Sequence, residues 1–320
     1  MTGFLHKLKR TVASRAKGLL RGQLAAAGYG VSPMSQVQLI DLRDSGNDPG
    51  QILYRAHLQP TLITAPVSHG RGLPMFSLDR NGHHPFVRAI SAAISRPESE
   101  RRGIISDTLE RYYRLVQPAS AAQLLGVAQS DAPRFADQPS WAALMPWDSV
   151  SLDEWCTNHQ LSVARENFDH GQSLTVADGW SWVGPVSRQK LEVEVLRLKK
   201  VLDSVLASGF ERNDGHDGDI LAAALVNEQQ QWRWQALTGQ HRAVVLAGLG
   251  YETIPIRIVK IVFRAQSRFW PNVANSLFSE ASALALFDRC FSGEEPPVTG
   301  EWVRQITEVA GEKQNVTGST

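Results

Sequence analysis

The most regular apolar pattern in the chain lies in residues 187–208. Its apolar residues are spaced three or four positions apart and share one helix face: Leu191, Val195, Leu198, Leu202 and Val205. Ser187 stands where an N-cap belongs, and Gly209 follows the last apolar residue. The pattern therefore predicts one long amphipathic helix that ends at Gly209.

Shorter apolar runs separated by glycines organise the segment that follows. They predict a strand at 220–226, a loop at 227–231, a strand at 233–237, a helix at 240–249, a strand at 253–263 and a helix at 280–291. Gly239 and Gly250 mark the two ends of the helix at 240–249. Past Gly293 the chain is polar, which favours a loose tail, although Trp302 and Ile306 are spaced to dock one last helical turn.

The first half of the chain has less regular patterns. Residues 104–115 predict an amphipathic helix, residues 87–94 begin another, and a short strand fits 37–42. The domain organisation that follows is a basic helix, a mostly helical region, an ordered domain and a flexible tail, at 1–26, 27–170, 171–291 and 292–320. The predicted fold class is α+β.

Composition describes an ordinary globular protein, with 42 % hydrophobic and 20 % charged residues. A net charge of +1 makes nucleic acid an unlikely partner. Cys156 and Cys290 have neither a disulfide framework nor zinc spacing, which favours a reducing compartment. No apolar run reaches the ~18 residues of a membrane span. The sequence therefore predicts a cytoplasmic location.

The N-terminus is strongly basic. Residues 1–40 contain no Asp or Glu, and Leu5, Leu8 and Val12 recur at helical spacing among lysines and arginines. A basic amphipathic helix can lie on an anionic membrane, here through residues 4–21, which would place the protein at the inner membrane face. The alternative is a helix that packs on the body of the protein and leaves its basic face in water.

Residues 237–258 combine a turn, a helix start and two basic side chains. Gly239 precedes Gln240, His241 and Arg242, where the predicted helix begins. The N–H groups at a helix N-terminus have no partner within the helix and favour anions. Arg242 can bind two phosphate oxygens, and His241 can donate to phosphate or act as a base. A turn stabilised by side-chain bonds to carbonyl groups is the alternative.

The order of these elements resembles the nucleotide-binding core of the ParB/sulfiredoxin superfamily over residues 184–263. The matching segments are SVLASG at 204–209, Gly-Gln-His-Arg at 239–242, Leu-Gly at 249–250 and Ile-Pro-Ile at 254–256. The resemblance implies a small mixed sheet with helices. It also implies that ATP or CTP binds at Gly239, Gln240, His241 and Arg242.

Departures from the superfamily pattern narrow the chemistry. Gln240 stands where sulfiredoxins have their nucleophilic cysteine, and Gln cannot attack a sulfinyl phosphate. Nothing after Phe263 resembles the DNA-recognition helix that partitioning ParB proteins need. The Gly-x-His-Arg pattern is most similar to the free serine kinase branch, which transfers a phosphoryl group to a small hydroxyl compound.

Phosphoryl transfer also needs a carboxylate as a base or for a metal. Lys190, Glu194 and Arg197 share a helix face away from the Leu stripe. They either point into a cleft, with Lys190 on the nucleotide and Glu194 in catalysis, or form ion pairs on a solvated face.

Two further clusters are candidates. The acidic loop around Asp214 and His216 offers Asp217 as a catalytic group, and Asp217 with Asp219 for Mg²⁺; turn chemistry explains the same residues. Arg264 and Arg268 follow the strand at 253–263 and can hold a second phosphate, or serve only as surface charges.

The sequence therefore predicts a nucleotide-dependent phosphotransferase with ATP or CTP and Mg²⁺, acting on a small or carbohydrate-like (glycan) hydroxyl compound. Its catalytic residues would be His241, Glu194 and Asp217. A non-catalytic nucleotide-sensing, regulatory or scaffold module is the first alternative. A ParB-like DNA-associated protein or nuclease is the second.

Overall fold

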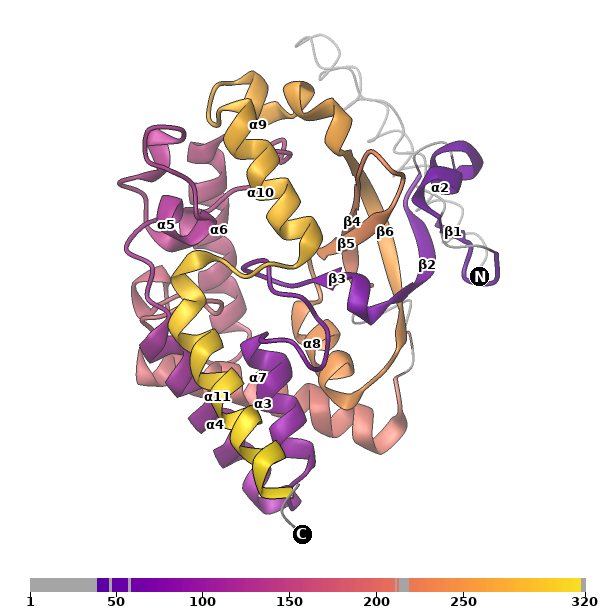
Figure 1. Ribbon diagram of the computed structural model, residues 1–320. Helices are drawn as coiled ribbons and strands as arrows, with labels where there is room; N and C mark the ends of the chain where they lie inside the picture. Colours follow the sequence, from indigo (N-terminus) through magenta and orange to yellow (C-terminus); the bar gives the residue numbers. More distant parts are fainter. Residues whose placement is uncertain (1–38, 46–47, 57–58, 211, 213–218, 318–320) are drawn as a thin grey trace, which may run out of the picture. The chain divides into compact units, whose positions relative to one another are not determined.

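The computed structural model describes residues 39–45, 48–56, 59–210, 212 and 219–317. Residues 39–320 form one compact unit (Figure 1). The predicted basic helix at 1–26, its membrane contact through residues 4–21, and Asp217 lie outside the described residues. Within the described residues, no helix combines the length and the apolar character needed to cross a membrane.

One mixed sheet of six strands organises the described part of the chain. The strands are β1 (Ile40–Asp41), β2 (Thr61–Pro66), β3 (Gly70–Arg71), β4 (Leu221–Val226), β5 (Trp232–Ala236) and β6 (Thr253–Phe263). Their spatial order is β1-β2-β6-β4-β5-β3. The long strand β6 pairs antiparallel with β2 and parallel with β4. A mixed sheet with helices packed on it confirms the α+β fold class.

Helices account for most of the remaining regular structure. The α-helices are α2 (Pro49–Ala56), α3 (Pro85–Ile94), α4 (Glu98–Leu115), α5 (Ala121–Leu125), α6 (Leu152–Phe168), α7 (Arg188–Ser208), α8 (Gln240–Leu249), α9 (Pro271–Ala274), α10 (Glu280–Ser292) and α11 (Gly300–Thr317). Short 3₁₀ turns connect them, at η1 (Val67–His69), η2 (Pro133–Phe135), η3 (Ser140–Ala142), η4 (Val176–Asp178), η5 (Arg264–Phe269) and η6 (Pro297–Thr299).

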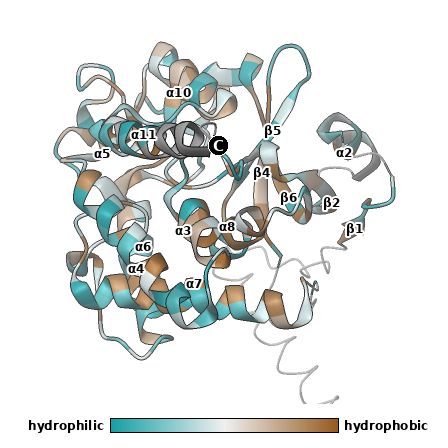
Figure 2. Ribbon diagram, turned by 60° about the horizontal axis from the view of Figure 1, so that its bottom comes forward, coloured by the Kyte–Doolittle hydropathy of each residue, from teal (hydrophilic) through white to brown (hydrophobic). Residues whose placement is uncertain are grey.

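The sheet separates two hydrophobic cores. Ala222 and Ala224 of β4 pack in the first core, whereas Ala223 and Leu225 pack in the second, as the two-residue period of a strand requires. Helices α3, α4, α7 and α8 contribute to the first core, and α5 and α10 to the second. Figure 2 shows hydrophobic residues gathered on α3, α8 and the strands beside them.

The predicted elements of the second half are confirmed. Helix α8 and strand β6 have the predicted bounds, and β4 and β5 lie within one residue of theirs. Helix α7 begins after Ser187, whose Oγ accepts from Lys190 N–H at 3.1 Å, and it ends at Gly209 with φ 73°. Strong local signals, namely caps and apolar periodicity, fix these boundaries.

The C-terminal segment differs from the predicted loose tail, because it contains the 18-residue helix α11. Trp302 is fully buried, and its indole N–H donates to the carbonyl of His83 at 2.7 Å. Its ring also packs on Tyr112, with centroids 5.3 Å apart. The buried Trp302 thus anchors a helix much longer than the single turn expected in this polar segment.

The predicted division between 27–170 and 171–291 also differs from the structure. Strands β1 to β3 come from the first region and β4 to β6 from the second, yet all six lie in one sheet. Ile63 of β2 pairs with Ile256 of β6, nearly 200 residues along the chain. Local patterns cannot indicate such a pairing.

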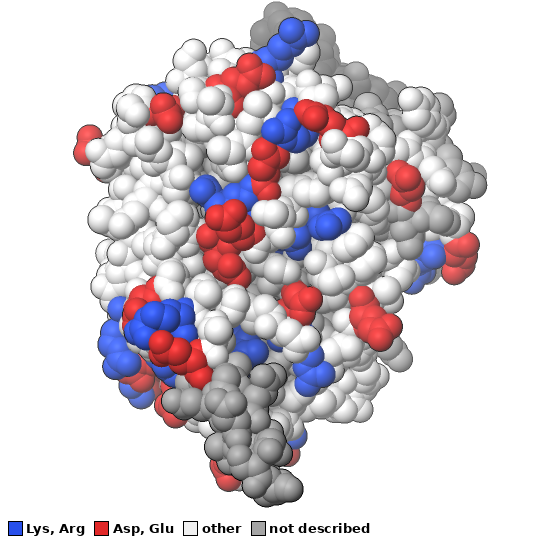
Figure 3. All heavy atoms as spheres, in the orientation of Figure 1, with Lys and Arg blue, Asp and Glu red and all other residues white. Residues whose placement is uncertain are grey.

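Charges on the described surface are arranged largely as ion pairs. Arg304 of α11 lies 2.6 Å from both Glu301 and Glu308. Figure 3 shows basic and acidic residues side by side on the face that it draws. The expectation that the protein does not bind nucleic acid stays a prediction from its net charge.

Arg71 of β3 ties the sheet to the C-terminal end of α10. The side chain is buried, and its Nε and Nη2 donate to the carbonyls of Cys290 and Phe291, each at 2.7 Å. Nη1 donates to the carbonyls of Gly70 and Ser68. Burial lowers the pKa of Arg71 to about 10, which leaves it charged at neutral pH. A cation thus satisfies carbonyls at the negative end of a helix dipole.

We predict that Arg71→Met lowers the free energy of unfolding by about 3 kcal/mol, because it leaves buried carbonyls without donors. Urea unfolding would measure the loss. Arg304→Met, which removes an exposed arginine with two partners, serves as the control and should change stability little. Equal losses in the two variants would contradict the capping role.

We also predict acid sensitivity from His84, the N-cap of α3. Its Nδ1 accepts from Phe86 N–H, its Nε2 has no partner among the described residues, and burial lowers its pKa to about 3. The unfolded chain binds this proton near pH 6.5, so stability falls as pH drops below that value, by about 2 kcal/mol at pH 5.

His84→Asn keeps a capping acceptor and removes the titration. The difference in unfolding free energy between pH 7 and pH 5 should therefore shrink in this variant, as measured by urea titration at both pH values. His170→Asn, at an exposed histidine, should leave the difference unchanged. If His84→Asn lost as much unfolding free energy between pH 7 and pH 5 as the wild type does, His84 would be excluded as the cause of the acid sensitivity.

Candidate functional site

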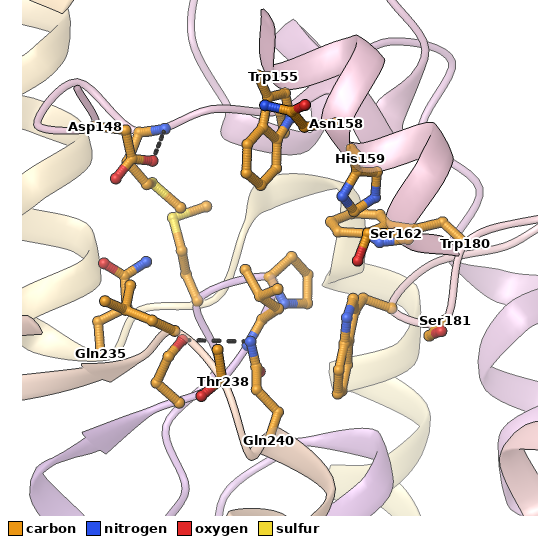
Figure 4. Close-up of a pocket in the computed structure, with 18 of the residues that line it drawn as sticks. Asp148, Trp155, Asn158, His159, Ser162, Trp180, Ser181, Gln235, Thr238 and Gln240 are labelled. Atoms are coloured by element: carbon orange, nitrogen blue, oxygen red, sulfur yellow. Dashed lines mark hydrogen bonds between the residues drawn. The ribbon is translucent and has the colours of Figure 1, made fainter. Parts of the chain in front are cut away.

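A cavity of about 610 Å³ lies where β5 turns into α8. Its walls come from this turn, from the loop after β3, from α6 and from the segment around Trp180 and Trp182. Figure 4 shows Gln235, Thr238 and Gln240 on one side of the space and His159, Ser162 and Trp180 on the other. The volume is within the range of cavities that hold small molecules.

The β5–α8 turn depends on Gly239. Its φ of 73° lies in the left-handed region, and a Cβ atom would come within 3.1 Å of Ile220. As the N-cap of α8, Gly239 makes no side-chain cap hydrogen bond. A helix N-terminus of this kind favours a negative charge.

Gln240 has a structural role that the sequence did not indicate. Its buried side chain accepts from Leu73 N–H at 2.8 Å and donates to the carbonyl of Ala236. It thereby holds the 73–75 segment against the turn as a wall of the cavity. Met75 in this segment has φ 106°, a conformation that persists in a non-glycine residue only where its surroundings fix it.

A buried charge cluster lies directly behind the cavity. Glu194 is fully buried, and its Oε1 lies 2.9 Å from Lys190 Nζ and 3.2 Å from Arg197 Nη1. Ser181 Oγ donates to the same oxygen at 3.0 Å. The other carboxylate oxygen, Oε2, lies 2.7 Å from His241 Nε2. Lys190 and Glu194 thus form a buried ion pair. This burial excludes the alternative that the two residues pair on a solvated helix face.

This cluster sets the protonation states at the site. Burial acts to raise the pKa of Glu194, but its hydrogen bond with His241 and the charges of His241, Arg197 and Lys190 hold that pKa well below its usual range. Burial and the positive charge of Arg197 lower the pKa of His241, although Glu194 opposes them. A neutral His241 that donates through Nε2 keeps Nδ1 as a proton acceptor.

Aromatic rings form much of the wall around His241. Its ring lies 5.4 Å from Trp182 and 6.0 Å from Phe86, measured between centroids. His159 stacks on Trp155 at 5.1 Å and meets the edge of Trp180 at 5.7 Å. The cavity therefore combines an ionisable end with flat apolar surfaces.

Helix α6 contributes a row of residues that the sequence analysis missed. The row consists of Trp155, Asn158, His159, Ser162 and Glu166, all of which line the cavity. Their spacings of three, four, seven and eleven positions after Trp155 put them on one helix face. The sequence signal for this helix face was the helical spacing of its polar and aromatic residues. A search for apolar periodicity alone does not detect such a face.

Several predicted site residues lie away from the cavity. Arg242 does not line it. Arg264 binds Asp288 through two hydrogen bonds and Glu228 through a third, so its charge is already neutralised. Arg268 lies over the ring of Phe269 at 4.6 Å. None of these three side chains lines this cavity, so their phosphate contacts stay a prediction from the sequence.

The predicted metal site is not supported at Asp219. Its carboxylate accepts from Arg212 Nε at 2.5 Å and lies 3.7 Å from Arg257. No group of three or more potential metal ligands occurs among the described His, Cys, Asp and Glu residues. Asp219 instead forms a buried ion pair next to β4.

We predict that Glu194→Gln destabilises the protein by about 3–5 kcal/mol, because it leaves the cations Lys190 and Arg197 without their buried counter-charge. Thermal and urea unfolding would measure this. Glu192→Gln, at an exposed position on the same helix, is the matched control and should have little effect. The double variant Lys190→Met/Glu194→Gln should lose less unfolding free energy than the sum of the losses in the two single variants. Losses that simply add would contradict an energetic coupling between the two residues.

Comparison with known proteins adds no relative, since the chain matches no protein-family model, no curated protein and no solved structure.

Proposed function

We propose that the cavity binds a nucleotide and that His241 acts as the general base in phosphoryl transfer to a hydroxyl compound. The observation that carries this proposal is the contact between His241 and the buried carboxylate of Glu194, at the first turn of α8 and against the cavity. The resemblance of residues 239–242 to the ParB/sulfiredoxin superfamily supports the same ligand, and we propose such a core within residues 171–291.

A guanidinium group and a helix N-terminus favour an anion at this end of the cavity. Arg197 lines the cavity together with residues 239–241 at the start of α8, and its Nη1 lies 3.2 Å from Glu194 and 3.4 Å from Glu166. Arg197 thus replaces Arg242 as the proposed arginine for the phosphates. The faces of Trp180 and Trp182 offer surfaces on which a nucleobase can stack.

The proposed phosphoryl transfer needs no reactant other than the nucleotide and the hydroxyl compound. His241 Nδ1 takes the proton of the acceptor hydroxyl, whose oxygen forms a new bond to the terminal phosphorus of ATP or CTP. The bond between that phosphorus and the bridging oxygen breaks, and the nucleoside diphosphate leaves. Glu194 orients the imidazole and stabilises its protonated form, so it is a positioning residue.

Mg²⁺ would accompany the nucleotide rather than occupy a site made only of protein ligands. It binds triphosphates with one or two carboxylates and water. Glu166 and Asp148 are the described carboxylates that line the cavity. Asp148 pairs with Lys260 at 3.1 Å and Glu166 with Arg197 at 3.4 Å, and we assign the more exposed carboxylate, Glu166, to the metal.

We predict that the full chain binds ATP or CTP in the presence of MgCl₂, as titration calorimetry would measure. His241→Gln keeps a donor for Glu194 but removes the base, so nucleotide affinity should change less than about threefold while diphosphate release falls by about 100-fold or more. Turnover would be measured with a pool of hydroxyl compounds as acceptors.

His170→Gln is the matched control, because it makes the same change at an exposed histidine. A wild-type protein that binds neither nucleotide would exclude the proposal. Binding without turnover would favour the alternative, a nucleotide-sensing module.

A further inference from the structure

The far end of the cavity, away from His241, contains an amide whose orientation is fixed. Gln235 of β5 is 4 % exposed, and its Oε1 accepts from the indole Nε1–H of Trp147 at 3.2 Å. An indole nitrogen only donates, so the amide oxygen must face Trp147. The NH₂ group then faces the cavity, where no acceptor among the described residues bonds to it.

The strand explains why Gln235 can face this cavity. Trp234 and Ala236 on either side of it pack in the first core, so Gln235 projects to the opposite side of β5. A ligand that displaces water from this part of the cavity must offer an oxygen or nitrogen acceptor to the NH₂ group, because a buried amide donor without an acceptor costs free energy.

An ion pair completes the polar set at this end. Lys260 Nζ lies 3.1 Å from Asp148 Oδ1, and Asp148 Oδ2 accepts from Met145 N–H at 3.1 Å. Lys260 and Gln235 are donors, whereas the carboxylate of Asp148 is only an acceptor. An anionic ligand group would face Asp148, and a group that only donates would face Lys260. A hydroxyl group both donates and accepts, so neighbouring hydroxyls satisfy all three residues.

The remaining walls fit the ring that such hydroxyls would belong to. Trp155 supplies a flat apolar surface, while Asn158 and Ser162 on the same face of α6 add polar groups. A sugar ring has apolar C–H faces and a rim of hydroxyls, which is the same combination. We propose that the end of the cavity formed by Gln235, Asp148 and Lys260 binds a sugar. Only the sugar's role as phosphoryl acceptor rests on the proposed function; its binding does not.

Saturation-transfer NMR on the full chain tests this binding. The probes are D-glucose, D-galactose, D-mannose, N-acetyl-D-glucosamine, D-ribose and myo-inositol. We expect transfer to at least one sugar in the wild type. Gln235→Glu preserves the acceptor for Trp147 but replaces the cavity-facing NH₂ with an oxygen, so the affinity for that sugar should fall at least tenfold. Gln160→Glu makes the same change on the exposed side of α6 and should leave the affinity unchanged.

A second variant keeps the test decisive if Gln235→Glu does not fold. Lys260→Met removes a donor that is partly exposed, and it should also lower the sugar affinity several-fold, whereas Lys199→Met on the surface of α7 should not. Nucleotide affinity is measured by calorimetry on the same samples, so failure of the proposed function would be seen separately.

Three results would overturn the sugar site. The first is a wild-type protein that shows transfer to none of the six probes. The second is a folded Gln235→Glu variant that binds the sugar as the wild type does. The third is a loss of ATP or CTP affinity in Gln235→Glu without any sugar binding, which would assign this end of the cavity to the nucleobase.

Discussion

The candidate site depends on the carboxylate of Glu194. It is fully buried, and it is the shared partner of Lys190, Arg197, Ser181 and His241. Without it, the buried Lys190 would lose its counter-charge, and Arg197 would keep only the partly exposed Glu166 as a partner. The same carboxylate fixes which nitrogen of His241 donates. Stability and proton chemistry at this site therefore have one origin.

Much of the second half of the fold could be predicted from the sequence because its signals are local. Caps at Ser187 and Gly239 and the glycines at 209 and 250 define α7 and α8 within a residue. The membership of β1 to β3 in the same sheet could not be predicted, since it depends on pairings across most of the chain. Only one last turn of helix α11 was offered by the sequence, at Trp302 and Ile306, because few apolar residues hold it: Trp302 is buried, and Val303 and Ile306 pack against the first core.

The site residues could be predicted only in part, and helix geometry gives the reason. Successive residues of an α-helix point about 100° apart, so Gln240, His241 and Arg242 cannot all face one cavity. Gln240 and His241 both line the cavity, although the Gln240 side chain also bonds to Leu73, and Arg242 lies outside the lining. A motif of adjacent residues thus identified the turn correctly but gave no information about which side chain faces a ligand.

The two ends of the cavity differ in the ligand chemistry that they can satisfy. At the α8 end, the helix N-terminus and the guanidinium of Arg197 favour a group with negative charge. At the Gln235 end, Lys260 is already neutralised by Asp148, so a charged group gains little there and hydroxyls gain most. The proposed nucleotide and the proposed sugar are therefore assigned to different ends. Under the proposed function, this arrangement points a hydroxyl of the sugar toward the phosphates beside His241.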